Sequence, residues 1–70
     1  MITIEVDCNS DEINLRDKNG NLIAMTKVQY PDKFIQMFQR IFDNCNEGRD
    51  EIGVQLTKID EDNRTTVGEW

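Results

Sequence analysis

The chain has 70 residues and a formal charge of −6 at pH 7, with 14 acidic residues against 8 basic ones and no histidine. At this length it forms one domain, residues 1–70, which buries only about 60% of its unfolded surface and leaves little room for a deep active site. The acidic balance argues against direct binding to nucleic acid or to an anionic membrane, because phosphate contacts require clustered cations; it suits a basic protein partner, although acidic charge also serves solubility alone.

The first predicted element is a strand, Ile2 to Cys8, in which apolar and polar residues alternate and give one apolar face. Two further strands, Glu12 to Arg16 and Leu22 to Val28, flank Asn19-Gly20, a dipeptide typical of β-hairpins. Because Leu22 to Val28 is apolar on both faces, we expect it inside the sheet rather than at an edge.

The register of this hairpin depends on the length of its loop. A two-residue loop pairs Leu15 with Ala24, whereas a three-residue loop with a bulge at Gly20 pairs Leu15 with Ile23. We favour the bulged form, because it places four apolar side chains on one face and a slip of one residue would scatter them. They are Ile13, Leu15, Ile23 and Met25.

The stretch from Tyr30 to Cys45, YPDKFIQMFQRIFDNC, predicts the one long helix, with Pro31 in its first turn and Gly48 as a left-handed residue after its end. Its apolar residues recur at the spacing of an amphipathic helix and include all three phenylalanines. We expect most of them to pack on the sheet, with Met37 and Phe42 at the margin of the contact. The residues expected to pack are Phe34, Phe38, Ile41 and Cys45.

A fourth strand, Glu51 to Ile59, follows the helix, and Thr65 to Trp70 is either a loose tail or a short extra strand. The order β-β-β-α-β predicts an α+β fold. It consists of a mostly antiparallel four-stranded sheet with one amphipathic helix on one face.

The sequence lacks the residues of common catalytic and metal sites. Histidine, the most frequent general base, is absent, and no glycine motif for phosphate binding occurs. Adjacent acids such as Asp60 and Glu61 point to opposite sides of an extended chain. Two acidic segments, Asp7 to Asp11 and Asp43 to Val54, hold the wrong residues at positions that a calcium loop requires. We expect no enzymatic activity, no metal and no cofactor.

The two cysteines, Cys8 and Cys45, lie on expected apolar faces, and we expect free thiols in a reducing cytoplasm. The first residues, MITIEVD, have neither a basic nor an apolar region of the kind found in signal peptides. No apolar run approaches the ~18 residues of a membrane span. The expected location is the cytoplasm of a host cell, without contact with a membrane.

Two kinds of residue are candidates for binding a partner. A rigid fold that holds carboxylates at distances comparable to the ~1.7 Å of axis per DNA charge can occupy a phosphate-binding groove; the simpler interpretation is an ordinary solvated surface. Exposed apolar residues could anchor a partner or join two copies of the chain, and Trp70 could instead attach the tail to the sheet. The candidates are Glu5, Asp7, Asp11, Glu12, Asp60, Glu61, Asp62, Met37, Phe42 and Trp70.

An acidic chain of this size, with an Asn-Gly hairpin before a helix that carries Phe34 and Phe38, resembles small phage-encoded inhibitors of host nucleic-acid enzymes. One is the phage inhibitor of uracil-DNA glycosylase, a dimeric DNA mimic with a hairpin, one helix and a final strand that begins Asp-Glu-Ile. Here Asp17 to Gly20, the two phenylalanines and Asp50-Glu51-Ile52 stand in those places. That family encloses an apolar side chain of the enzyme with aromatic residues, which implies this role for Phe34 and Phe38.

The chain is also similar to acidic anti-CRISPR proteins, some of which carry an Asn/Asp-Gly-Asn hairpin before a helix containing Lys-Phe-Ile. The corresponding residues are Asn19-Gly20-Asn21 and Lys33-Phe34-Ile35. Compared with the glycosylase inhibitor, this chain has a longer helix, a less acidic hairpin turn, and an added N-terminal strand and tail.

These observations predict a non-enzymatic inhibitor of phage type. Its expected partner is a basic host protein, a nucleic-acid-binding enzyme of defence or repair, with CRISPR effectors first and uracil-DNA glycosylase second. The alternative is a small structural or assembly module that self-associates through exposed apolar residues, and a homodimer is compatible with both.

Overall fold

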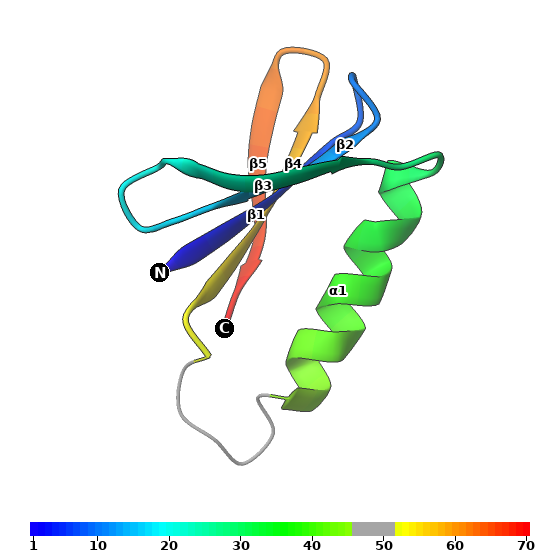
Figure 1. The fold of residues 1–70 in the computed structure, drawn as a ribbon. Helices are drawn as coiled ribbons and strands as arrows, with labels where there is room; N and C mark the ends of the chain where they lie inside the picture. Colours follow the sequence, from blue (N-terminus) through cyan, green and yellow to red (C-terminus); the bar gives the residue numbers. More distant parts are fainter. Residues whose placement is uncertain (46–51) are drawn as a thin grey trace.

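A computed structural model describes residues 1–45 and 52–70, which form one helix and a five-stranded sheet (Figure 1). The α+β class is confirmed, but the sheet has five strands rather than four. None of the described helices is long and apolar enough to cross a membrane. The elements are β1 (Ile2–Asp7), β2 (Glu12–Arg16), β3 (Leu22–Lys27), α1 (Pro31–Cys45), β4 (Val54–Asp60) and β5 (Asn63–Glu69).

The strands lie in the order β3-β2-β1-β4-β5. The central pair, β1 and β4, is parallel, with Ile4 opposite Leu56, and the other three pairs are antiparallel. A parallel pair requires a long crossover, and α1 lies in the connection that leads from the edge strand β3 back to β4. The sheet is therefore mixed, and the carboxyl ends of β1 and β4 lie at the same end of it.

The apolar core lies between α1 and the two central strands, which the helix contacts (Figure 1). Val6 of β1, Leu56 of β4 and Ile35 of α1 are the buried apolar residues of the described chain. Three buried apolar side chains make a thin core, as expected for a chain of this length. The half-buried apolar residues around it are Ile4, Cys8, Ile13, Phe38, Val67 and Trp70.

The helix begins at Pro31, one residue after the predicted start at Tyr30, and it is rotated relative to the expected packing. Its most buried residues are Pro31 and Ile35, whereas Ile41 and Cys45, which were expected to pack on the sheet, are exposed. Phe42, expected at the margin, contacts the last residue of the chain: its ring centroid lies 5.1 Å from that of Trp70. The predicted residue after the helix, Gly48, lies outside the described residues.

The predicted hairpin exists, but the preferred register is wrong. Leu15 pairs with Ala24 and not with Ile23, and Arg16 pairs with Leu22, so that the irregularity falls at the start of β3. The loop sets this register, because the Asp17 carboxylate accepts the N–H groups of Asn19 and Asn21, both at 2.9 Å. Side-chain contacts of this kind are typical of Asp in turns.

The expected position of β3 inside the sheet is also wrong, since β3 is an edge strand with all six residues exposed. The alternative of an extra strand at the C-terminus is confirmed and is longer than expected, Asn63–Glu69. This strand pairs with β4, and the Trp70 carbonyl accepts the N–H groups of Gly53 and Val54. The positions beside β4 and β1 are thus taken, which leaves β3 outermost.

Candidate functional site

Six of the 14 acidic residues of the chain lie where two turns meet. Because β1 and β4 are parallel, the turn after β1 (residues 8–11) and the turn after β4 (residues 61–62) lie at the same end of the sheet, at the top of Figure 1. We call this region the acidic end. It carries Asp7, Asp11, Glu12, Asp60, Glu61 and Asp62.

Asn9 joins the two turns. Its side-chain amide donates to the carbonyl of Glu61 at 2.7 Å and accepts the N–H of Glu61 at 2.7 Å. The N–H of Cys8 donates to the carbonyl of Ile59 at 2.8 Å, which continues the parallel pairing up to the turn. These bonds join the two turns into one unit, although 52 positions of sequence separate Asn9 from Glu61.

The backbone at the acidic end takes unusual conformations. Asp11 and Glu61 have positive φ angles, 53° and 54°, a region that glycine occupies most readily. A left-handed residue other than glycine costs about 1–2 kcal/mol. Each turn thus carries a carboxylate at the position where glycine would be easiest to accommodate. Strain of this kind is typical of functional sites.

Several carboxylates of the acidic end form no ion pair, although the Lys27 ammonium donates to the Ser10 carbonyl in the same turn at 3.1 Å. Glu12 lies 2.9 Å from Lys27, and Asp60 lies 4.0 Å from Lys58. Within residues 1–45 and 52–70, no ion pair involves the other four acids of this end, although Asp7 accepts the N–H groups of two turn residues. Those four are Asp7, Asp11, Glu61 and Asp62.

The acids of the described chain do not converge on a point. No group of three or more potential ligand side chains is placed to hold a metal ion, in the part of the chain that the structure describes. The acidic end is therefore a spread of charge along two turns. Such a spread fits a row of basic groups on a protein partner.

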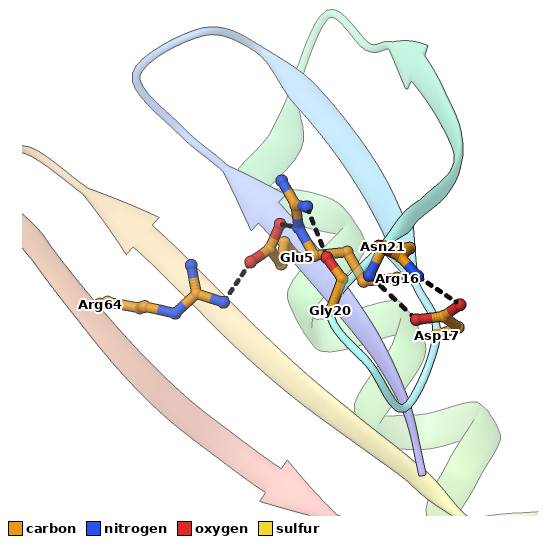
Figure 2. Close-up of polar contacts among 6 residues, drawn as sticks. All are labelled: Glu5, Arg16, Asp17, Gly20, Asn21 and Arg64. Carbon is orange, nitrogen blue, oxygen red and sulfur yellow. Dashed lines mark hydrogen bonds and ion pairs between the residues drawn. The ribbon is translucent and has the colours of Figure 1, made fainter.

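Glu5, predicted as part of the same acidic surface, lies elsewhere and is engaged within the chain. It is only 1% exposed, on the sheet face opposite α1. Arg16 donates to one carboxylate oxygen at 2.6 Å, and Arg64 donates to the other (Figure 2). Burial raises the pKa of Glu5, but the hydrogen bonds and charges of the two arginines outweigh it and keep the pKa below its usual value. Glu5 is consequently not available to a partner.

Polar residues surround Glu5 on this face. Asn14 of β2 and Thr57 of β4 lie directly opposite it on the neighbouring strands, and both are buried. The Asn14 Oδ1 atom has no hydrogen-bond partner in the described chain. The arrangement was missed from the sequence, although alternation along β1 and β2 places Glu5, Asn14 and Arg16 on one face; Arg64 belongs to a strand that was left open.

The hairpin loop beside this cluster is held by hydrogen bonds. Arg16 Nη1 donates to the carbonyl of Gly20 at 3.0 Å, and Asn21 contacts Asp17 (Figure 2). The hydrogen bond from the Asn21 backbone N–H is the main interaction that lowers the pKa of Asp17 below its usual value. The hairpin loop predicted from Asn19-Gly20 is thus hydrogen-bonded to Arg16, the last residue of β2.

The apolar candidates divide into engaged and exposed residues. Phe42 stacks on Phe38 with centroids 5.8 Å apart and also contacts Trp70. The Trp70 indole donates to Asp43 at 2.7 Å, so the end of the chain is attached to α1. Met37, in contrast, is 44% exposed and lines a shallow hollow of about 120 Å³ with Lys33 and Phe34.

Comparisons with known protein families, with curated proteins and with solved structures found no match for this chain. The function must therefore be inferred from the chemistry of the surface.

Proposed function

We propose that the chain is a non-enzymatic inhibitor of phage type, which binds the nucleic-acid-contacting surface of a host defence or repair enzyme in the host cytoplasm. CRISPR effectors are the first target class and uracil-DNA glycosylase is the second. The observation that carries the proposal is the acidic end, where Asn9 joins two turns that hold unpaired carboxylates.

Rigidity is what makes these carboxylates suitable. Asp7 is fixed by accepting the N–H groups of Asn9 and Ser10, at 2.9 and 3.1 Å, and Asp11 and Glu61 lie in constrained turn positions. A partner that binds preordered charges does not have to order them first. Complementary charge also accelerates the encounter of two proteins. The acidic end would thus compete with nucleic acid for the same lysines and arginines.

The alternative, a module that self-associates through Met37, Phe42 and Trp70, has fewer exposed residues than expected. Phe42 and Trp70 contact each other and Asp43, which leaves Met37 as the exposed member of the predicted apolar set. Met37 alone gives little area for self-association through that set, so a contact between copies would have to use other exposed residues, such as Leu22, Ile23 and Met25 of β3. The inhibitor is therefore the function that the described surface supports best.

The test is a pull-down from host lysate at ~0.1 and ~0.5 M salt, with and without competing nucleic acid, because screening weakens a contact between exposed charges. The informative variant is Asp11→Asn with Glu61→Gln, which keeps the shape of the side chains and a residue that tolerates positive φ at position 11. Glu69→Gln with Asp43→Asn is the matched control, since it removes the same charge outside the acidic end and keeps an acceptor for the Trp70 indole.

We expect capture of a nucleic-acid enzyme by the wild-type chain and the control, and at least tenfold less capture by the acidic-end variant. Both high salt and nucleic acid should reduce capture. Capture that is insensitive to salt, to nucleic acid and to the acidic-end variant contradicts the proposal.

A further inference from the structure

The outermost strand, β3, is unprotected. All six residues of Leu22–Lys27 are exposed, and Leu22, Ile23 and Met25 are 49, 55 and 51% exposed. Edge strands usually carry charges or proline that prevent pairing with another strand. The one charged residue of β3, Lys27, lies at its end and contacts Glu12 at 2.9 Å.

The other edge of the sheet is different. β5 carries Arg64 and Glu69 at its two ends and a register irregularity opposite Leu56 and Thr57. The residue that follows it, Trp70, is bonded through its backbone to Val54 and through its indole to Asp43. The described sheet thus has one apolar edge and one polar edge.

Main-chain groups that do not take part in the sheet line the apolar edge, although the Lys27 carbonyl accepts the Thr26 hydroxyl at 3.4 Å. The N–H of Val28, just after β3, donates at 2.9 Å to the carbonyl of Asp11, just before β2. Because the bonding direction alternates along an antiparallel strand, Thr26 also faces β2, whereas Met25 and Lys27 direct their N–H and C=O groups away from the sheet. β3 can therefore accept another strand without losing its pairing with β2.

We propose that β3 joins two copies of this chain, paired antiparallel about a twofold axis into one continuous ten-stranded sheet. Pairing Met25 with Lys27 of the second copy satisfies the outward groups of both strands, and it places the two Thr26 side chains opposite each other, a favourable cross-strand pair. The same surface is used on both copies, as a twofold interface requires.

The composition of β3 and the symmetry of its pairing favour a second copy of the chain as the occupant, despite the like charge of the two copies. Copies with a net charge of −6 repel each other, so they can associate only through a surface without excess carboxylate. β3 contains no acidic residue. Because each copy uses the same β3 edge, a β3–β3 contact closes after two copies and does not continue into a fibre.

The contact is small, which sets its expected strength. Six residues at about 3.4 Å each give an edge about 20 Å long, which is modest beside the ~800 Å² per partner of a standard interface. We expect a dimer that is mostly dissociated at ~1 μM and predominant at ~500 μM. The proposal is independent of the acidic end, and either proposal can fail alone.

Sedimentation velocity over this concentration range tests the dimer, at ~0.1 and ~0.5 M salt. Two variants test its location. Met25→Pro removes an N–H that points away from β2, which proline at an edge tolerates. Met25→Lys places a cation beside Lys27 of the second copy and leaves the backbone intact. Thr65→Lys, on exposed β5, is the matched control, and circular dichroism verifies folding.

We expect the wild type and Thr65→Lys to dimerise to a similar extent, with more dimer at ~0.5 M than at ~0.1 M salt because screening weakens the repulsion between the acidic copies. Both Met25 variants should weaken the dimer at least tenfold. If Met25→Pro does not fold, Met25→Lys decides. A wild-type chain that remains monomeric at ~500 μM overturns the proposal. A dimer that persists unchanged in Met25→Lys also overturns it, because the contact then lies elsewhere.

Discussion

The two faces of the sheet bury neighbouring residues by different means. Val6 points toward α1 and is fully buried in the apolar core, while Glu5, the residue before it, points to the opposite face and is 1% exposed. A helix covers the first face. On the second face, two arginine side chains cover a carboxylate and neutralise it. A single-layer sheet can thus exclude water from its uncovered face when long cationic side chains lie across it.

The largest expected effect is on the helix-covered face. Leu56→Ala removes a fully buried side chain from a thin core, and we expect a loss of about 3–5 kcal/mol in the free energy of unfolding. Because the total unfolding free energy of a small domain is only a few times larger, such a loss would leave much of the chain close to unfolding. Urea denaturation followed by circular dichroism measures the effect. A loss below about 1 kcal/mol would show that the core lies elsewhere.

Removing the buried charge of the uncovered face should cost less unfolding free energy than Leu56→Ala, but more than removing an ordinary surface ion pair. Glu5→Gln leaves Arg16 and Arg64 without a charged acceptor, and hydrogen bonds to charged groups contribute about 1.5–3 kcal/mol. Both arginines are partly exposed and can turn to water, so we expect the lower part of this range. Glu12→Gln is the control, because its pair with Lys27 lies at the surface and should contribute less than about 1 kcal/mol. Equal losses in the two variants would mean that Glu5 behaves as a surface residue.

The ion pairs of Glu5 with Arg16 and Arg64 predict that the free energy of unfolding depends on pH. The folded-state pKa of Glu5 lies below its usual 4.5, so the stabilisation by its ion pairs is complete above that pH and is lost as the pH falls through the folded-state value. The difference in unfolding free energy between the wild type and Glu5→Gln should therefore shrink below about pH 4.5. Urea titrations from pH 7 to 3 measure it; a difference that grows in acid contradicts the pairing.

The smallest expected effect concerns the thiols. Cys8 packs against the core on the helix-covered face, and burial raises the pKa of its thiol, whereas Cys45 is exposed at the end of α1. We expect iodoacetamide to modify Cys45 at least about tenfold faster than Cys8 at pH 8, because the thiolate is the reactive form. Mass spectrometry of timed samples gives both rates. Similar rates would show that α1 does not cover the start of the β1–β2 turn.

Local patterns predicted the local structure of this chain. The alternation in β1, the Asn19-Gly20 hairpin and the helix from Pro31 are each visible within a few residues of sequence. Pairings between distant segments were not visible in this way. The parallel pairing of β1 with β4 and the edge position of β3 depend on how strands distant in the sequence pair. The apolar pattern on both faces of β3 did not reveal that β3 lies at an edge.

The candidate site shows the same limit. The acids of the two turns were predicted as partner-binding groups, but only the parallel β1–β4 pair brings the turns together. Glu5 was grouped with them because it precedes Asp7 on the same strand; its partner Arg64 lies 59 positions away in a strand that the sequence left open. The contact of Phe42 with Trp70 likewise joins residues 28 positions apart, which meet only in the folded chain.

The link through Asn9 has a consequence for how this surface can change during evolution. One amide fixes the separation of two hairpin tips that are encoded far apart. An insertion in either tip would displace the other as well, so the lengths of both should vary together or not at all. Substitutions of individual acids carry no such constraint, so the charge pattern can change while the spacing of the two tips is retained.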